Sequence, residues 1–269
     1  MTERFLDGRQ AFVTGGTSGI GLAIAQGLAA AGARVAINGL GDADAIGAAI
    51  ESLRHAGAAD ARHWGADLRD AAAIEAMLAE LQAWGRTDIV VNCAGMQFTG
   101  SIESMPRERW DAILAINLSA AFQTMQALLP SMAQRGYGRI INIASVHGLV
   151  ASVQKAPYVA SKFGLVGLTK VAALEYASAG SRDSGGVTAN CICPGWVETP
   201  LIESQIQARA AQHGNDRAAG IADLLSEKQP SRRMSSTDDI AALSLFLCRR
   251  EAHNINGASL PVDGAWTAQ

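Results

Sequence analysis

The sequence predicts an α/β fold with one doubly wound parallel sheet. Short apolar segments rich in Val and Ile alternate with longer segments of helical periodicity, and short loops join them. Most of the apolar segments lack a two-residue alternation, as expected of strands buried on both faces. The alternation of strands with helices places helices on both faces of the sheet and any site at the carboxyl ends of its strands.

The elements follow one another in a regular order, and each strand precedes a helix or a long connection. The predicted strands are residues 10–14, 34–38, 62–66, 89–93, 139–144, 187–193 and 259–262. The predicted helices are residues 20–31, 42–55, 71–84, 106–135, 157–179 and 237–248. Pro106 and Pro157 suit first-turn positions of helices, and the small polar residues 181–186 suit an exposed loop. No repeat or linker divides the chain, so residues 1–269 are interpreted as one domain.

Composition excludes several classes of protein. Hydrophobic residues make up 49% of the 269 residues, charged residues make up 17%, and the formal net charge is −3. A disordered chain would be more polar, and a nucleic-acid partner would call for a basic excess. The first nine residues mix charges without an apolar run, unlike a secretory signal. No run approaches the roughly 18 apolar residues that span a bilayer. We therefore expect no membrane and no nucleic-acid partner.

The cysteines favour a reducing compartment. Cys93, Cys191, Cys193 and Cys248 lie in apolar segments, where buried thiols are usual. No second Cys/His pair accompanies Cys191 and Cys193 at zinc spacing. The sequence therefore predicts no metal, no disulfide and a cytoplasmic location.

A glycine-rich turn lies between the first strand and the first helix. Residues 14–21 read Thr-Gly-Gly-Thr-Ser-Gly-Ile-Gly, a G-x-x-x-G-x-G spacing rather than the commoner G-x-G-x-x-G. Glycines let a pyrophosphate approach the backbone, and the helix N-terminus offers free N–H groups. A plain tight turn is the alternative. The residues predicted to hold the phosphates are Gly15, Thr17, Ser18, Gly19, Ile20 and Gly21.

The residues at the carboxyl ends of the next three predicted strands indicate which dinucleotide binds. Residues 38–42, which include Leu40, carry no Arg or Lys to meet a 2′-phosphate, so NAD is predicted rather than NADP. Asp67 and Leu68 suit an adenine pocket, although a helix cap explains Asp67 equally well. A backbone wall along the cofactor is predicted at Asn92, Ala94 and Gly95.

Tyr158 and Lys162 are spaced to share one helix face. With so few Tyr and Lys, chance would give this spacing about 0.04 times. A phenol is a poor base at neutral pH, and an ammonium about 5 Å away would lower its pKa. Tyr158 could then take an alcohol proton, with Ser145 bonded to the substrate oxygen. Asn117, a weak helix former, calls for a partner such as a water bound to Lys162. A surface Tyr/Lys pair together with a capping Ser is the alternative.

Four polar side chains are expected around this group: Gln97, His147, Lys155 and Gln205. Two amides, an imidazole and an ammonium suit a small carboxylate better than a long apolar substrate. Each could instead be an ordinary solvated loop residue. Residues 200–225, which carry Gln205, are interpreted as a mobile helical lid that closes on the substrate. A plain surface helical hairpin is the alternative.

Taken together, these motifs resemble the short-chain dehydrogenase/reductase family over nearly the whole chain. The motifs are Thr14-Gly15-xxx-Gly19-x-Gly21, Asn92-x-Ala94-Gly95, Asn117, Ser145, Tyr158-xxx-Lys162 and Pro194-Gly195. The resemblance implies a Rossmann fold, a catalytic set of Asn117, Ser145, Tyr158 and Lys162, and a homotetramer built through two long helices. Cys93 replaces the Asn that the family more often has, beside the cofactor wall.

Four segments resemble, more closely, bacterial members that interconvert (R)-3-hydroxybutyrate and acetoacetate with NAD. The segments are residues 92–97, 143–152, 193–200 and 260–269. This resemblance implies that Gln97, His147, Lys155 and Gln205 hold the carboxylate. It also implies that Trp196 and Trp266 cover the substrate. Further cofactor contacts are implied at Pro194, Gly195, Val197 and Thr199. The remaining alternatives are a reductase of another 3-oxo acid or thioester and a non-catalytic NAD-binding regulator.

Overall fold

The computed structural model describes residues 3–268 and contains one parallel sheet. Seven strands lie in the order β3-β2-β1-β4-β5-β6-β7, and every neighbouring pair is parallel. The strands are β1 Gln10–Thr14, β2 Arg34–Asn38, β3 Ala61–Trp64, β4 Ile89–Asn92, β5 Tyr137–Ile143, β6 Gly186–Pro194 and β7 Ser259–Val262. The order reverses between β1 and β4, and such a reversal opens a crevice at the carboxyl ends of the strands. The predicted doubly wound α/β fold is confirmed.

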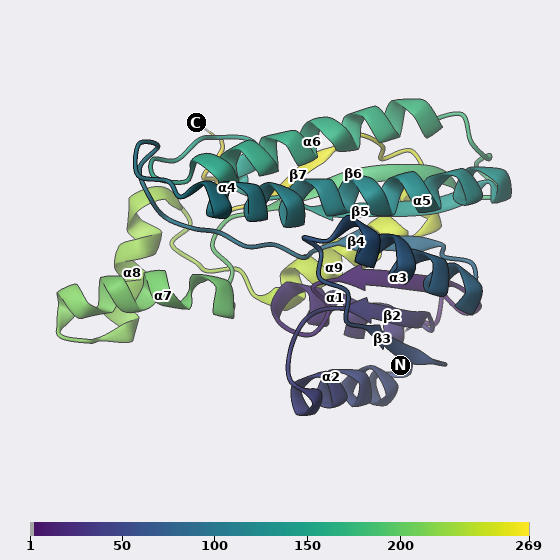
Figure 1. The fold of residues 1–269 in the computed structure, drawn as a ribbon, viewed down its shortest axis with the longest axis horizontal. Coiled ribbons are helices and arrows are strands. Elements are labelled where there is room, and N and C mark those ends of the chain that lie inside the picture. The colour runs from purple at the N-terminus through teal and green to yellow at the C-terminus, as the bar shows by residue number, and fades with distance from the viewer. Residues whose placement is uncertain (1–2, 269) are drawn as a thin grey trace.

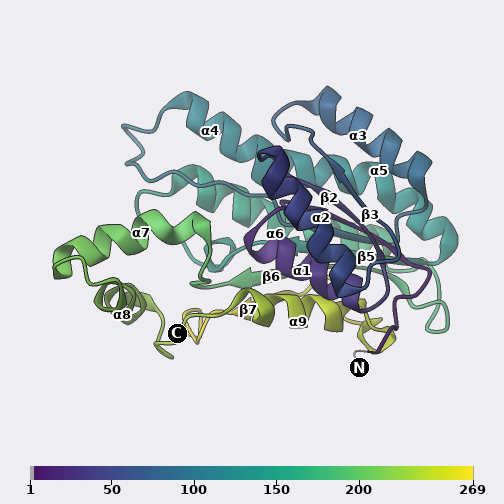
Figure 2. The same ribbon diagram turned by 90° about the horizontal axis from the view of Figure 1, so that it is seen from below.

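Helices cover both faces of the sheet (Figures 1 and 2). On one face lie α1 Gly19–Ala30, α2 Ala43–Ala56 and α9 Thr237–Cys248. On the other lie α3 Ala71–Trp84, α4 Arg107–Leu114, α5 Ala120–Arg135 and α6 Ala156–Tyr176. Short helical turns occur at η1 Ala115–Ser119, η2 Val146–Gly148, η3 Ala211–His213 and η4 Arg250–Ala252.

The two faces bury separate apolar clusters. Ile24 and Leu28 of α1 pack with Ile240 of α9 on one side of the sheet. Met77 of α3 packs with Leu128 of α5 on the other. Because the strands are buried between these layers, they lack the alternating pattern of a half-exposed sheet.

The predicted helix over residues 106–135 is interrupted. Pro106 is the N-cap of α4 rather than a first-turn residue, and a π-helical turn, η1, separates α4 from α5. A π turn inserts one residue into the helical repeat. Here it buries the side chain of Asn117, which bonds to the backbone of Met96 on the loop after β4.

Residues 107–135 form a helical stretch long and apolar enough to cross a membrane by length and composition. The same stretch packs in the core, where Met125, Leu128 and Met132 of α5 are buried. The core helix of a globular protein meets the same criterion, so the finding is weak support for a membrane span.

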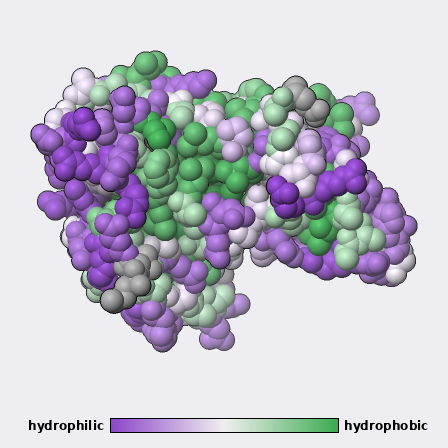
Figure 3. Space-filling model, turned by 180° about the vertical axis from the view of Figure 1, so that it is seen from behind, coloured by the Kyte–Doolittle hydropathy of each residue, from purple (hydrophilic) through white to green (hydrophobic). Residues whose placement is uncertain are grey.

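Residues 200–228 form two helices that stand away from the sheet, and we call them the lid lobe. The helices are α7 Pro200–Ala210 and α8 Arg217–Lys228, joined through η3. They project from one side of the body in Figure 1 and stand out at the right of the rear view in Figure 3. Ile202, Ile206 and Leu224 form an apolar cluster separate from the two main ones. The lobe therefore has its own small core.

Candidate active site

A cavity of about 460 Å³ opens at the carboxyl ends of the central strands. Most of the residues predicted for the cofactor and the substrate line it. They are Gly15, Ser18, Gly19, Ile20, Gly21, Ala94, Gly95, Gln97, Ser145, His147, Lys155, Tyr158, Lys162, Pro194, Gly195, Trp196, Val197, Thr199 and Trp266.

The glycine-rich turn leaves the backbone bare at one end of this cavity. Gly15 has φ +64°, and a Cβ at this position would lie 2.8 Å from the Cα of Ala94. Ser18, the N-cap of α1, makes no side-chain capping bond, so its side chain does not occupy the first N–H groups of the helix. Bare backbone and open N–H groups at a helix N-terminus fit the pyrophosphate of a dinucleotide.

Five of the predicted cofactor residues do not line the cavity: Thr17, Leu40, Asp67, Leu68 and Asn92. Thr17 lies against Gly39 at the end of β2, and Leu40 beside it is 63% exposed. Leu68 is buried in the core. The Asn92 side chain points into the interior, where it bonds with Asn142 and Thr124. Asn92 could contribute only backbone to a cofactor wall.

Asp67 accepts hydrogen bonds from the backbone and guanidinium of Arg69. These bonds lower the pKa of Asp67 to about 2. The cap of α3 is Asp70, which accepts from the backbone N–H groups of Ala72 and Ala73. The helix-cap interpretation of Asp67 is therefore wrong.

Tyr158, Lys162 and Ser145 all line the cavity. The Lys162 ammonium is 5.6 Å from the Tyr158 ring centroid and donates to the Ile143 carbonyl at 2.7 Å. Burial raises the pKa of Tyr158, opposed by a hydrogen bond with Ser145, and burial lowers the pKa of Lys162 to about 8. In the chain by itself the pKa of the phenol is therefore raised, where the sequence predicted a lowered one, because desolvation is the largest influence on it.

Asn117 lies behind this group and does not line the cavity. Its Oδ1 accepts from the Met96 N–H at 2.9 Å, and its Nδ2 donates to the Met96 carbonyl at 3.0 Å and to Ser161 Oγ at 3.1 Å. The sequence predicted a partner such as a water bound to Lys162, and the partners in the structure are the Met96 backbone, between Gly95 and Gln97, and Ser161.

Lys155 lies between two amides. Its ammonium donates to Gln97 Oε1 at 3.4 Å and to Gln205 Oε1 at 3.3 Å, and it lies 5.4 Å from the Trp196 ring centroid. Burial, followed by repulsion from Lys228, lowers the pKa of Lys155 to about 8. An ammonium has three donors, so one remains for an anion in the cavity. The structure thus brings together residues from the β4 loop, the α6 N-cap and the lid lobe.

His147, Trp196 and Trp266 also line the cavity. The His147 Nδ1 lies 3.2 Å from the Val150 carbonyl, and the ring meets Trp266 edge-on, with centroids 5.5 Å apart. Burial lowers the pKa of His147 to about 4, so the ring is neutral near pH 7. Because Nδ1 then donates to the carbonyl, Nε2 is an acceptor. Trp196 packs on Trp266 at 5.7 Å between centroids.

Sequence reasoning missed several lining residues: Cys93, Ile143, Ala144, Val146, Pro200, Leu201 and Ile202. Four of them, Cys93, Ala144, Val146 and Pro200, directly adjoin predicted site residues, so proximity alone could have indicated them. Leu201 and Ile202 belong to α7, and only the fold brings them to the cavity. Burial raises the pKa of the Cys93 thiol to about 12. All four cysteines are free thiols. No group of three or more His, Cys, Asp or Glu within residues 3–268 could hold a metal.

Comparison with known proteins gives one family. A family model described as short chain dehydrogenase matches residues 9–210. The chain is 51% identical to a D-beta-hydroxybutyrate dehydrogenase of Cupriavidus necator, covering 98% of this chain and 100% of that protein. It is 44% identical to a protein of the same name from Rhizobium meliloti, covering 97% and 99%. A crystal structure of a gluconate 5-dehydrogenase from Burkholderia cenocepacia with NADP and tartrate is 34% identical, with TM-score 0.85 and coverage of 99% and 98%.

Proposed function

The chain belongs to the short-chain dehydrogenase family, and from this premise we propose that it is an NAD-dependent (R)-3-hydroxybutyrate dehydrogenase. It would oxidise (R)-3-hydroxybutyrate reversibly to acetoacetate. The observation that carries the substrate is the Lys155 ammonium, held between Gln97 and Gln205 in the cavity that also contains Tyr158. The two relatives named D-beta-hydroxybutyrate dehydrogenase support the same substrate.

The substrate carboxylate binds at Lys155. Its ammonium retains one donor for a carboxylate oxygen, and Gln205 can add an amide N–H because its Oε1 already accepts from Lys155. A neutral His147 with Nδ1 turned to Val150 has no donor for this anion, so it supports Trp266 instead. Trp196 and Trp266 exclude water from the bound acid.

The alcohol end binds at Tyr158 and Ser145. The Tyr158 oxygen takes the alcohol proton, and Ser145 fixes the substrate oxygen by a hydrogen bond. A bound nicotinamide ring would supply the acceptor for the hydride that leaves the alcohol carbon, together with a positive charge. Lys162 adds a second positive charge 5.6 Å from the phenol ring, and both charges favour the phenolate that burial disfavours.

NAD is the proposed cofactor. The bend after β2, residues 39–42, carries no Arg or Lys to meet a 2′-phosphate. Asp42 in this bend instead caps α2 through a bond from the Ala45 N–H. Some structural relatives carry NADP, so turnover with NAD and with NADP distinguishes the two cofactors.

The lid lobe closes over the substrate and carries Gln205 to it. Its apolar cluster is separate from those of the sheet, as suits a segment that moves as a unit, and Gln97 Nε2 donates to the Leu201 carbonyl of α7 at 3.0 Å. This contact favours the lid over a plain surface hairpin.

The working form is a cytoplasmic homotetramer, without membrane or nucleic-acid partners. Large hydrophobic side chains are exposed on the two long helices: Phe122 on α5, and Phe163, Val171 and Leu174 on α6. Their burial against another subunit would favour association. Four free thiols suit a reducing compartment. Light scattering of the purified protein tests the tetramer.

The function is tested by NADH formation from separate (R)- and (S)-3-hydroxybutyrate, repeated with NADP. We expect turnover of the (R) enantiomer with NAD, and at least tenfold less with the (S) enantiomer or with NADP. Turnover of neither enantiomer would overturn the proposal.

A reductase of a 3-oxoacyl thioester is the rival activity, because a thioester lacks the free carboxylate. Lys155→Met keeps the apolar stem and removes the ammonium. We expect it to raise KM for (R)-3-hydroxybutyrate at least tenfold, whereas Arg54→Met, on α2, should leave KM unchanged. An unchanged KM in Lys155→Met would favour the thioester.

A further inference from the structure

Lys228 is a lysine for which the proposed reaction has no role. It is the last residue of α8, at the end of the lid lobe, and its side chain is only 32% exposed. The lining residues of the cavity do not include it. It nevertheless reaches the segments that do line the cavity.

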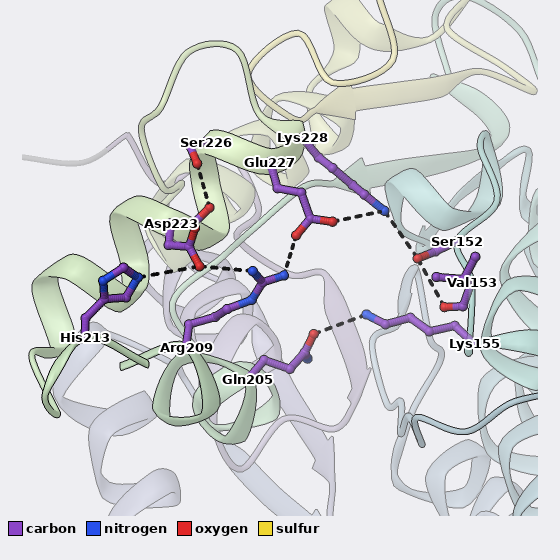
Figure 4. Close-up of polar contacts among 10 residues, drawn as sticks. All are labelled: Ser152, Val153, Lys155, Gln205, Arg209, His213, Asp223, Ser226, Glu227 and Lys228. Carbon is purple, nitrogen blue, oxygen red and sulfur yellow. Dashed lines mark hydrogen bonds and ion pairs between the residues drawn. The ribbon is translucent and has the colours of Figure 1, made fainter. Parts of the chain in front are cut away.

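Three segments around the carboxylate end of the cavity meet at the Lys228 ammonium. It donates to Ser152 Oγ at 3.5 Å, on the loop that leads to Lys155. It lies 5.8 Å from the ring centroid of Trp266, near the C-terminus. It is 3.9 Å from the Glu227 carboxylate of its own helix. Figure 4 shows Lys228 turned from the lid lobe toward Ser152, close to the Lys155–Gln205 contact.

A charge network within the lid lobe orients Lys228. Glu227 also pairs with Arg209 of α7, and Arg209 pairs in turn with Asp223 of α8 at 3.0 Å (Figure 4). Arg209 therefore ties α7, which carries Gln205, to the helix end that carries Lys228. Two of the lid contacts with the body, Gln205 to Lys155 and Lys228 to Ser152, are thus linked through this network.

The charge of Lys228 also acts on the site. It lowers the pKa of Lys155 and of His147 by repulsion, whereas Glu227 raises that of Lys155. Lys155 is thus faced by Lys228 and Glu227 from α8 and by His147 from η2, with Arg209 of α7 engaged by Glu227. A substrate carboxylate entering beside Lys155 would meet both ammonium groups.

We propose that Lys228 is a positioning residue of the substrate site, which holds the lid lobe against the loop of residues 149–155 and so keeps Lys155 and Gln205 on the carboxylate. This inference rests on the proposed function for its substrate, but the contact between Lys228 and Ser152 does not depend on that function. The positioning acts on substrate binding, so its loss should change KM more than kcat.

The test compares Lys228→Met with Lys228→Arg. Loss of one charge-assisted hydrogen bond should raise KM for (R)-3-hydroxybutyrate about fivefold to tenfold in Lys228→Met, with kcat within about twofold of the original. The alkaline limb of kcat/KM should move to higher pH, because removal of a like charge raises the pKa of Lys155. Lys228→Arg should restore both KM and the pH of the alkaline limb. Arg54→Met controls for the loss of one exposed charge.

Amide hydrogen exchange gives a second measurement that needs no substrate. In Lys228→Met, residues 149–155 and 200–228 should exchange faster than in the original chain, while the strands should not change. If neither exchange nor KM changed, the inference would be overturned. If the original chain oxidised neither enantiomer, the proposed function would fail, and the exchange measurement would still decide the role of Lys228.

Discussion

Asn117 binds both polar groups of the Met96 backbone, at 2.9 Å through its Oδ1 and at 3.0 Å through its Nδ2. A single buried amide thus fixes the loop that carries Gly95 and Gln97 into the cavity. The π-helical turn at residues 115–119 presents this amide to the loop.

Asn117→Ala should therefore reduce both stability and turnover. Two backbone groups would lose their partner, at a cost of about 2–4 kcal/mol in the free energy of unfolding. Urea denaturation and kcat measure the two effects. Ser161→Ala, which removes only one of the bonds to Asn117, should cost about 1 kcal/mol. Equal denaturation midpoints for Asn117→Ala and the original chain would contradict this role.

Tyr158→Phe should lower kcat by about 10²–10⁴-fold, the usual contribution of a general base. Lys162→Met should also lower kcat, because it removes the charge that favours the phenolate. Intrinsic fluorescence titration with NAD checks that both variants still bind cofactor. Undiminished NADH formation in Tyr158→Phe would rule out the proposed base.

Carboxylate binding should weaken above about pH 8. Lys155 is protonated below its pKa of about 8 and neutral above it, so the charge that meets the anion disappears as pH rises. The affinity for butyrate, which cannot react, should fall up to about tenfold per pH unit in the alkaline range. Calorimetric titration measures it without interference from Tyr158. Lys155→Arg should keep the affinity constant to higher pH, and a flat profile in the original chain would argue against Lys155 as the anion partner.

His147 should make the protein less stable in acid. Its pKa is 6.5 in an unfolded chain and about 4 when folded. As pH falls through this window, the unfolded chain binds a proton that the folded chain does not. The contribution of His147 to the free energy of unfolding is therefore full above pH 6.5 and declines toward pH 4. The total loss is about 3 kcal/mol, at about 1.36 kcal/mol per pKa unit. Urea denaturation at several pH values should show a shallower decline in His147→Gln. Parallel curves would exclude His147 as the cause.

The local hydrophobic pattern was sufficient to predict the fold, but it did not predict where every strand ends. Apolar strands alternating with helices predicted every strand of the sheet. The predicted third strand nevertheless ran to residue 66, whereas β3 ends at Trp64. The Asn38 side chain binds the carbonyls of Trp64 and Ala66 there, a long-range contact that periodicity does not contain.

The site was predicted where chemistry-bearing residues occur in motifs, and missed where the fold alone brings residues together. Tyr158 and Lys162 are rare residue types at a helical spacing, so they were visible in sequence. Asn117 signalled only that it needed a partner, and its partner, Met96, is distant in sequence. Lys228 carried no signal, because its contact with Ser152 depends on how α8 packs against the body.

The separate core of the lid lobe has a consequence for how new specificities can arise. Ile202, Ile206 and Leu224 form an apolar cluster separate from those that pack on the sheet, so this segment can change without disturbing the packing of the sheet. A chimaera that exchanges residues 200–228 with those of a relative acting on another alcohol should fold and retain its nicotinamide binding. The lid lobe can therefore be exchanged as a unit, and substitutions confined to it could change the substrate specificity from one hydroxy acid to another during evolution.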